Sequence, residues 1–232
     1  MRVRAFDGFW QVTLLPRVFP VSVYLVEEPD GLTLIDTGLP HMATGILRAT
    51  ARIGQPIRRI ALTHSHLDHA GGLDRLRAAL PDAVVACSAR EAPLLAGDLS
   101  LRPGEPPALG GVLPGRWVSA RTAPDQMLVD GEKLGSLTAV ATPGHTPGHM
   151  AYYHDPSGAV FAGDAFQVRG GLAVAGQHRP TFPFVARATW NAMLALASGR
   201  RLARLPVRWL AAAHGQVLVN PVPAMRHIVG AG

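Results

Sequence analysis

The sequence is poor in several residue types and patterns, and each shortage removes a class of protein. Its single cysteine, Cys87, excludes an internal disulfide, so the fold must rest on packing or on bound metal. No apolar run approaches the roughly 20 residues of a membrane span. Residues 1–10 lack the continuous apolar stretch of a signal peptide. These shortages favour a cytoplasmic protein that does not bind a membrane.

Lysine is nearly absent, because Lys133 is the only one in a chain whose net charge is +6. A basic protein can bind nucleic acid, since phosphates attract clustered basic side chains. The arginines here are scattered singly or in pairs such as Arg58–Arg59 and Arg200–Arg201. This distribution favours a solvated arginine surface and argues against a nucleic-acid partner.

The chain has the length and composition of a globular protein, with 232 residues, 48% of them hydrophobic and 16% charged. Strands and helices alternate without a repeat or a linker, so we expect one α/β domain over residues 1–232. The expected strands are 21–26, 32–35, 59–62, 84–87, 137–141, 150–154, 159–162 and 207–212. The expected helices are 39–53, 72–80, 89–96 and 186–197. Segments 97–124 and 166–183 are expected to be irregular loops that cover a pocket.

The segment ALTHSHLDHAGG at residues 61–72 concentrates three histidines and an aspartate within six positions. His64 and His66 can converge on one side of an extended backbone, while Asp68 and His69 can face a second point nearby. Zinc bound through nitrogen and oxygen needs three or more protein ligands. Further candidates follow predicted strands, namely His145, Asp164 and His214. The pattern indicates two adjacent metal half-sites.

These motifs, together with Leu-Ile-Asp-Thr-Gly at residues 34–38, resemble in type and order those of the metallo-β-lactamase superfamily of hydrolases. The resemblance covers most of the chain and implies a mixed α/β (α+β) fold, an αββα sandwich with a dinuclear metal site between its sheets. The ligands that it implies are His64, His66 and His145 for the first metal, Asp68, His69 and His214 for the second, and Asp164 as the bridge. It also implies that Asp36 and His149 support the ligands without binding metal.

The resemblance implies two zinc ions, although iron or manganese suits such ligands as well. Two cations about 3.5 to 4 Å apart can share one water and lower its pKa towards neutrality. Asp68 is placed to accept a proton from this water and to pass one to the leaving group. The sequence shows no convincing serine or cysteine nucleophile, so we expect attack by a metal-bound hydroxide.

The chain differs from individual branches of the family at a few motif positions, and these differences reduce the number of substrate classes that we expect. True β-lactamases with this motif lack the bridging Asp164, so the chain is more similar to glyoxalase II, the lactonases and RNase Z. Gln167 stands where acyl-homoserine lactonases have a tyrosine, and little chain follows His214 to form the glutathione-binding extension of glyoxalase II. Because the chain is compact and shows no extra domain that could hold a polymer, we predict hydrolysis of a small ester, thioester or lactone.

Two alternatives stay open at this point. One is a phosphodiesterase or nuclease of the same fold, which the positive charge favours. The other is a mononuclear iron enzyme similar to the persulfide dioxygenases, or a metal-binding protein without catalysis. For a small-molecule substrate, Arg169, His178 and Arg179 are predicted to bind an anionic group, with Phe182 and Phe184 as an apolar wall. The sequence indicates neither the acyl group nor the oligomeric state.

Overall fold

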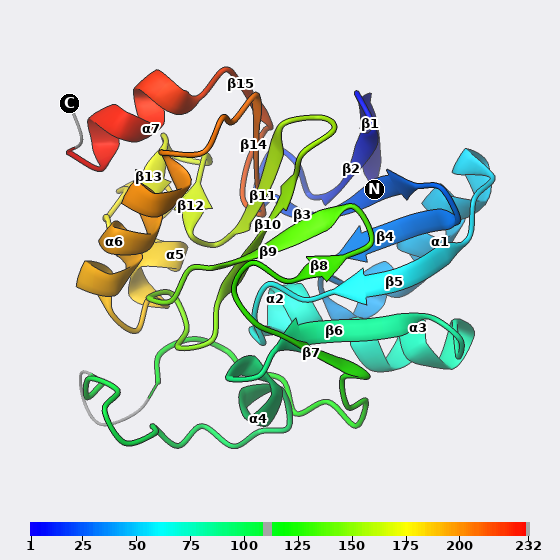
Figure 1. The fold of residues 1–232 in the computed structure, drawn as a ribbon, viewed down its shortest axis with the longest axis horizontal. Helices are drawn as coiled ribbons and strands as arrows, with labels where there is room; N and C mark the ends of the chain where they lie inside the picture. Colours follow the sequence, from blue (N-terminus) through cyan, green and yellow to red (C-terminus); the bar gives the residue numbers. More distant parts are fainter. Residues whose placement is uncertain (109–112, 231–232) are drawn as a thin grey trace.

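Two β-sheets packed face to face form the centre of the computed structural model, which describes residues 1–108 and 113–230 (Figure 1). The first sheet has the order β1 (Arg2–Phe6), β2 (Phe9–Leu14), β3 (Val21–Glu28), β4 (Gly31–Ile35), β5 (Ile57–Ala61), β6 (Val84–Ser88) and β7 (Gln126–Leu128). The second has the order β15 (Leu218–Val219), β14 (Trp209–Ala212), β11 (Ala159–Gly163), β10 (Met150–His154), β9 (Leu137–Ala141) and β8 (Lys133–Leu134). A short hairpin pairs β12 (Phe166–Gln167) with β13 (Ala173–Val174).

Helices cover the outer face of each sheet, on opposite sides of the sandwich in Figure 1. The first sheet packs against α1 (Ala43–Ile53) and α3 (Leu73–Ala79), and the second against α5 (Phe184–Arg187), α6 (Ala192–Leu202) and α7 (Val222–Ile228). The remaining helices are η1 (Pro40–Met42), α2 (Leu67–Ala70) and α4 (Glu91–Leu95). Within the described residues no helix could cross a membrane, since α1 and α6 have 11 residues each and the others are shorter.

The alternation of side chains along the strands explains this layering. In β3, Val23 and Leu25 pack against α1 and α3, whereas Tyr24 and Val26 enter the core between the sheets. All four are buried, because helices cover one face of the strand and the second sheet covers the other. A strand that is covered on both faces is apolar on both faces. The predicted αββα sandwich is confirmed.

The expected strands and the first three expected helices all form, within a few residues of their predicted bounds. The helix expected at 186–197 is wrong, because the chain breaks between α5 and α6. Strands β1, β2, β7, β8 and β15 and helix α7 were not expected. Segment 166–183 contains the β12–β13 hairpin, so it is less irregular than predicted. Of segment 97–124, residues 109–112 lie outside the described residues, and the rest forms no helix or strand.

Candidate metal centre

The predicted ligands meet at one edge of the sandwich, beyond the carboxyl ends of strands from both sheets. β5 runs into segment 64–69, the β9–β10 connection carries His145, and β11 and β14 end just before Asp164 and His214. β4 pairs parallel with β5, and β11 pairs parallel with β14, so their carboxyl ends open to the same edge. Tertiary structure therefore brings together side chains that are far apart in the sequence.

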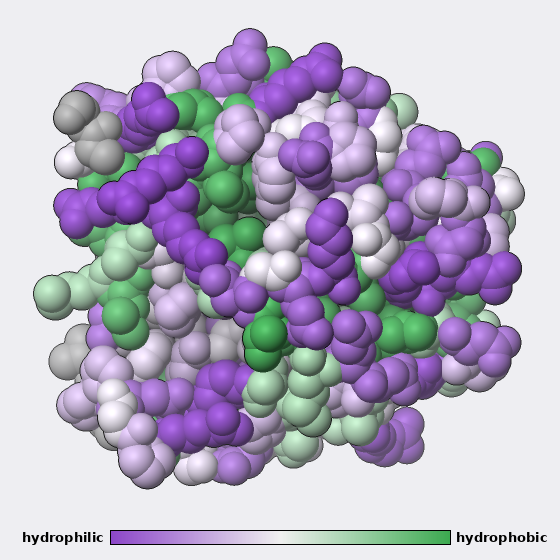
Figure 2. All heavy atoms as spheres, viewed as in Figure 1, coloured by the Kyte–Doolittle hydropathy of each residue, from purple (hydrophilic) through white to green (hydrophobic). Residues whose placement is uncertain are grey.

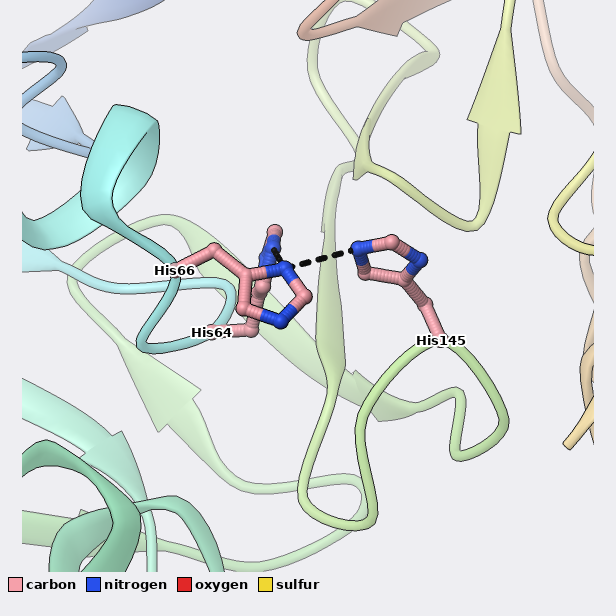
Figure 3. Close-up of side chains that lie close together, drawn as sticks. All are labelled: His64, His66 and His145. Carbon is pink, nitrogen blue, oxygen red and sulfur yellow. Dashed lines mark hydrogen bonds between the residues drawn. The ribbon is translucent and has the colours of Figure 1, made fainter. Parts of the chain in front are cut away.

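Three imidazoles form the first half of the cluster (Figure 3). His66 Nδ1 lies 3.1 Å from His64 Nε2 and 3.0 Å from His145 Nε2. All three side chains are buried. In Figure 3, His64 and His66 come from one loop and His145 reaches them from another. Three nitrogens therefore face one point.

Asp68, His69 and His214 form the second half of the cluster. Asp68 Oδ2 lies 3.4 Å from His214 Nε2 and 4.0 Å from His69 Nε2. Asp164 stands between the halves: its Oδ1 lies 3.5 Å from His69 Nε2 and 3.4 Å from His214 Nε2, and its Oδ2 lies 3.3 Å from His145 Nε2. The two oxygens of this carboxylate thus face different halves of the cluster.

In each imidazole of the cluster, the ring nitrogen that points away from the cluster centre is hydrogen-bonded to an oxygen of the protein. The bonds are His64 Nδ1 to Thr63 Oγ1 (3.1 Å), His66 Nε2 to the Pro114 carbonyl (3.2 Å), His145 Nδ1 to Thr189 Oγ1 (3.1 Å), His69 Nδ1 to Asp36 Oδ2 (2.7 Å) and His214 Nδ1 to the Pro20 carbonyl (2.7 Å). Carbonyl and carboxylate oxygens only accept, and both threonine hydroxyls already donate elsewhere. Each outer nitrogen therefore carries a proton, so an imidazole of the cluster that is neutral presents a lone pair on its inner nitrogen.

This arrangement fits a bound cation. Hydrogen bonds between the inner nitrogens of the first half would require an extra proton, but burial lowers the pKa of His66 to about 4 and holds that of His64 and His145 well below the ordinary value. His69 Nε2 and Asp164 Oδ1 are buried without a hydrogen-bond partner among the described residues. A divalent metal would satisfy the converging lone pairs and the orphaned polar atoms together.

The second half of the cluster has a strongly negative potential. Burial alone would lower the pKa of His214, but Asp164 and Asp68 outweigh it and raise this pKa to about 10. Burial would raise the pKa of both aspartates, but the facing histidines hold the pKa of Asp68 and of Asp164 below the usual range. The carboxylates are therefore ionised at neutral pH, and this half attracts positive charge.

Asp36 and His149 hold the predicted ligands in place without facing the cluster centre themselves. Asp36 has a left-handed backbone with φ of 59°, and it accepts hydrogen bonds from the Thr63 backbone nitrogen and from His69. The backbone nitrogen of Asp164 donates to His149 Nε2 at 3.2 Å, and the other ring nitrogen of His149 meets the Thr142 hydroxyl at 2.8 Å. The supporting roles of Asp36 and His149 stay predictions, and these contacts are the ones through which each residue would act.

A pocket of about 350 Å³ opens onto the cluster. Asp68 reaches it with a side chain that is 25% exposed, so it is the more accessible of the two carboxylates in the cluster. The walls are mostly apolar, from Phe19, Leu39, Leu67, Phe184, Val185 and Ala188. Arg116, an exposed residue, is the one arginine among the described residues that line it. The pocket suits a small molecule with an apolar part and an anionic part.

The comparisons with known proteins agree with this geometry. A family model described as the metallo-beta-lactamase superfamily matches residues 16–214. The chain belongs to this superfamily. The protein YobT of Bacillus subtilis is 46% identical over 99% of this chain and 97% of YobT. A hydroxyacylglutathione hydrolase of Rhodopseudomonas palustris is 32% identical over 75% of this chain and 56% of that enzyme, so the chain spans little more than half of it.

Solved structures of the superfamily share the fold. The crystal structure of TTHA1623 in a di-iron-bound form aligns with a TM-score of 0.67 and 30% identity, over 92% of this chain and 96% of that one. The predicted superfamily and the prediction of an enzyme are confirmed at this level, because the relatives are hydrolases. A metal-binding protein without catalysis is thereby set aside.

In this superfamily member, the residues predicted to contact substrate lie away from the metal pocket. The lining of that pocket, as far as the structure describes it, does not include Arg169, His178 or Arg179. Arg169 donates to the Arg17 carbonyl at 2.8 Å, Arg179 donates to the Leu172 carbonyl, and His178 is exposed. Phe184 does line the pocket, whereas Phe182 is buried behind it. The arginine at the pocket is Arg116.

Arg116 reaches the pocket because its loop lies against the ligand segment. The Leu67 backbone nitrogen donates to the Arg116 carbonyl at 2.7 Å, and Trp117 stacks edge-on against His66. Gly115 has φ of 108°, and a Cβ there would meet His66 Nε2 at 2.2 Å, so only glycine allows this approach. The sequence offered only a weak signal for Arg116, namely a glycine-rich loop expected to cover a pocket.

Proposed function

We propose that this chain is a dizinc hydrolase of small esters, thioesters or lactones that carry an anionic group. The observation that carries the proposal is the position of Asp68, an accessible carboxylate at the floor of a pocket that opens onto the cluster. His64, His66 and His145 would hold one metal, Asp68, His69 and His214 the other, and Asp164 would bridge them. Iron or manganese would suit the same nitrogen and oxygen ligands.

The bound metals would supply Lewis acidity and a water whose pKa is close to neutral. Asp68 is ionised, because the neighbouring histidines lower its pKa, so it can accept a proton inside the pocket and transfer it to the leaving group. Hydrogen bonds from the outer ring nitrogens keep the histidines in one orientation while this happens. Asp68 is therefore proposed as the catalytic residue.

The pocket lining supports the substrate class. Phe19, Leu67 and Phe184 would hold an apolar acyl or alkyl part, and the Arg116 guanidinium would bind a carboxylate through its fork of donors. The hydroxyacylglutathione hydrolase among the relatives is named for a thioester of this general kind. A cavity of about 350 Å³ favours small molecules over polymers.

Kinetics on purified protein tests the proposal, after elemental analysis, from which we expect about two metal ions per chain. We expect activity on an ester, thioester or lactone panel, and Asp68→Asn should lower kcat by roughly 10² to 10⁴. Arg116→Gln should raise KM about tenfold for anionic substrates and leave KM for neutral analogues unchanged. Asp82→Asn, at an exposed aspartate outside the cluster, is the matched control.

Several outcomes would contradict the proposal. If wild-type protein is stable and contains no metal, the cluster is not a metal centre. Activity of Asp68→Asn within about threefold of wild type would remove Asp68 from the reaction. Cleavage of phosphodiesters alone would replace the proposed substrate class with that of a phosphodiesterase.

A further inference from the structure

A second cavity, of about 280 Å³, lies beside the chain segments that hold His214. Its lining includes Pro20, whose carbonyl oxygen anchors the His214 ring, and Gly215, the next residue along the chain. The backbone nitrogens of Val168 and Arg169, which also line it, donate to the His214 carbonyl. The lining residues differ from those of the metal pocket, so the two cavities are separate features.

Two exposed arginines of strand β1 line this cavity from the inner side of the first sheet. Arg2 pairs with Thr13 of β2 and Arg4 pairs with Gln11, so each pair shares one face of the sheet. Gln11 in turn pairs with Tyr24, which belongs to the core between the sheets. Both arginines are exposed, because β1 is the edge strand of its sheet, and the Arg4 guanidinium lies 5.5 Å from the centre of the Phe6 ring.

Arg169, from the connection between β12 and β13, is the third arginine of the lining, and its guanidinium donates to the Arg17 carbonyl. Other arginines of the described chain form ion pairs, such as Arg59 with Asp30 and Arg90 with Glu105. Within residues 1–108 and 113–230, no ion pair involves Arg2, Arg4 or Arg169. Three like charges thus surround one cavity without a carboxylate to balance them.

Neutral polar groups complete the wall. Gln11 and Thr13 are buried, with 3% and 5% exposed, and Gln11 is held by a 2.9 Å bond from its amide nitrogen to the Gly215 carbonyl. Gly170 and Gly215 contribute backbone without side chains. Figure 2 shows hydrophilic side chains along much of the upper margin of the molecule, with some hydrophobic ones between them. The cavity is therefore polar, positively charged and open to solvent.

We propose that this cavity binds the phosphate group of a small molecule, at a site independent of the metal centre. Guanidinium groups match the oxygens of phosphate with paired hydrogen bonds, and three of them balance a doubly charged group. Charged residues on an edge strand can also prevent pairing with other sheets. That role would explain Arg2 and Arg4, but it would not explain why Arg169 from another part of the chain lines the same cavity.

Calorimetric titration of the metal-loaded protein with inorganic phosphate at low salt tests this site. We expect the double variant Arg2→Gln/Arg4→Gln and the single variant Arg169→Gln each to bind phosphate at least tenfold more weakly than wild type. The matched control is Arg48→Gln/Arg52→Gln, which removes the same charge from the exposed side of α1 and should stay within twofold. Circular dichroism confirms that each variant is folded.

The metal centre could itself bind phosphate, so a second comparison separates the two sites. Phosphate binding at the arginine cavity persists in His66→Ala and in chelator-treated wild type, whereas binding at the metal centre is lost in both. Unchanged affinity in the arginine variants, or loss on metal removal, overturns the proposal. Failure to bind phosphate together with salt-sensitive binding of single-stranded RNA also overturns it, in favour of a nucleic-acid surface. None of these results depends on whether an ester is hydrolysed.

Discussion

At the scale of single residues, Glu91 shows how one side chain can organise the centre without facing it. Its carboxylate is fully buried, accepts a hydrogen bond of 2.7 Å from the Ser65 backbone nitrogen and accepts one of 3.0 Å from the Thr146 hydroxyl. Ser65 lies between His64 and His66, and Thr146 follows His145. Glu91 therefore ties together the two segments that carry the first half of the cluster.

Glu91 should make stability fall with rising pH. Burial, partly opposed by its hydrogen bonds, raises the pKa of Glu91 from 4.5 to about 7, so the unfolded chain releases this proton at lower pH than the folded one. Ionisation of Glu91 by itself should therefore lower the unfolding free energy of the metal-free protein by roughly 1–3 kcal/mol between about pH 4.5 and 7. The buried histidines, whose pKa burial lowers, contribute in the opposite direction. Denaturation curves at both pH values should show that Glu91→Gln gains stability relative to wild type by this amount as pH rises, and that Asp82→Asn does not. Parallel pH profiles for Glu91→Gln and wild type would contradict the assignment.

At the scale of elements, the break between α5 and α6 supports the metal centre. Trp190 and Asn191 donate backbone hydrogen bonds to the carbonyls of His145 and Gly144, at 3.0 and 2.8 Å. Thr189 holds the outer nitrogen of His145. A continuous helix would use these backbone donors internally, so the break frees them to fix the ligand loop. This contact explains why helical periodicity over residues 186–197 gave the wrong prediction.

The start of α6 depends on its cap. The Asn191 side chain accepts a hydrogen bond of 3.0 Å from the Leu194 backbone nitrogen, at a residue with extended φ of −142°. Asn191→Ala should lower the unfolding free energy by about 1 kcal/mol, whereas Asn191→Asp keeps an accepting oxygen and should stay close to wild type. Urea denaturation measures both. Equal stability of the alanine variant and wild type would show that the cap adds nothing.

At the scale of the whole molecule, the metal centre joins the two halves of the sandwich. Segment 64–69 follows the first sheet, whereas His145, Asp164 and His214 follow strands of the second. Ligands shared across the sheets should make metal binding a contribution to folding stability, because metal binds the folded chain and the unfolded chain has no preformed site.

Metal removal should therefore lower the melting temperature. A free metal concentration 1,000-fold above Kd stabilises a protein by about 4 kcal/mol, which for a chain of this size corresponds to roughly 10 °C in Tm. Calorimetry before and after chelation, and again after adding zinc, checks the change and its reversal. His66→Ala should show a smaller shift. An identical Tm with and without metal would mean that the centre does not link the sheets.

The sequence by itself determined the order of strands and helices and the set of ligand candidates, because both depend on local signals, whereas the αββα sandwich was implied by the resemblance to the superfamily. Apolar strands alternate with helices, and the polar motifs stand directly after strands, as at His64, Asp164 and His214. The short edge strands β1, β7 and β15 gave weaker signals, since few apolar residues define them.

Only the tertiary structure decided which side chains support the centre and line the cavities. Glu91 is hydrogen-bonded to a residue that is distant in the chain, and Arg116, Arg2 and Arg4 line cavities together with residues that are distant in the chain. No spacing in the sequence reveals these contacts. The same reason accounts for Arg169, which was predicted at the metal pocket and lies at the second cavity instead. Which residues contact a side chain across the fold depends on how the two sheets pack, and a local sequence pattern does not encode that packing.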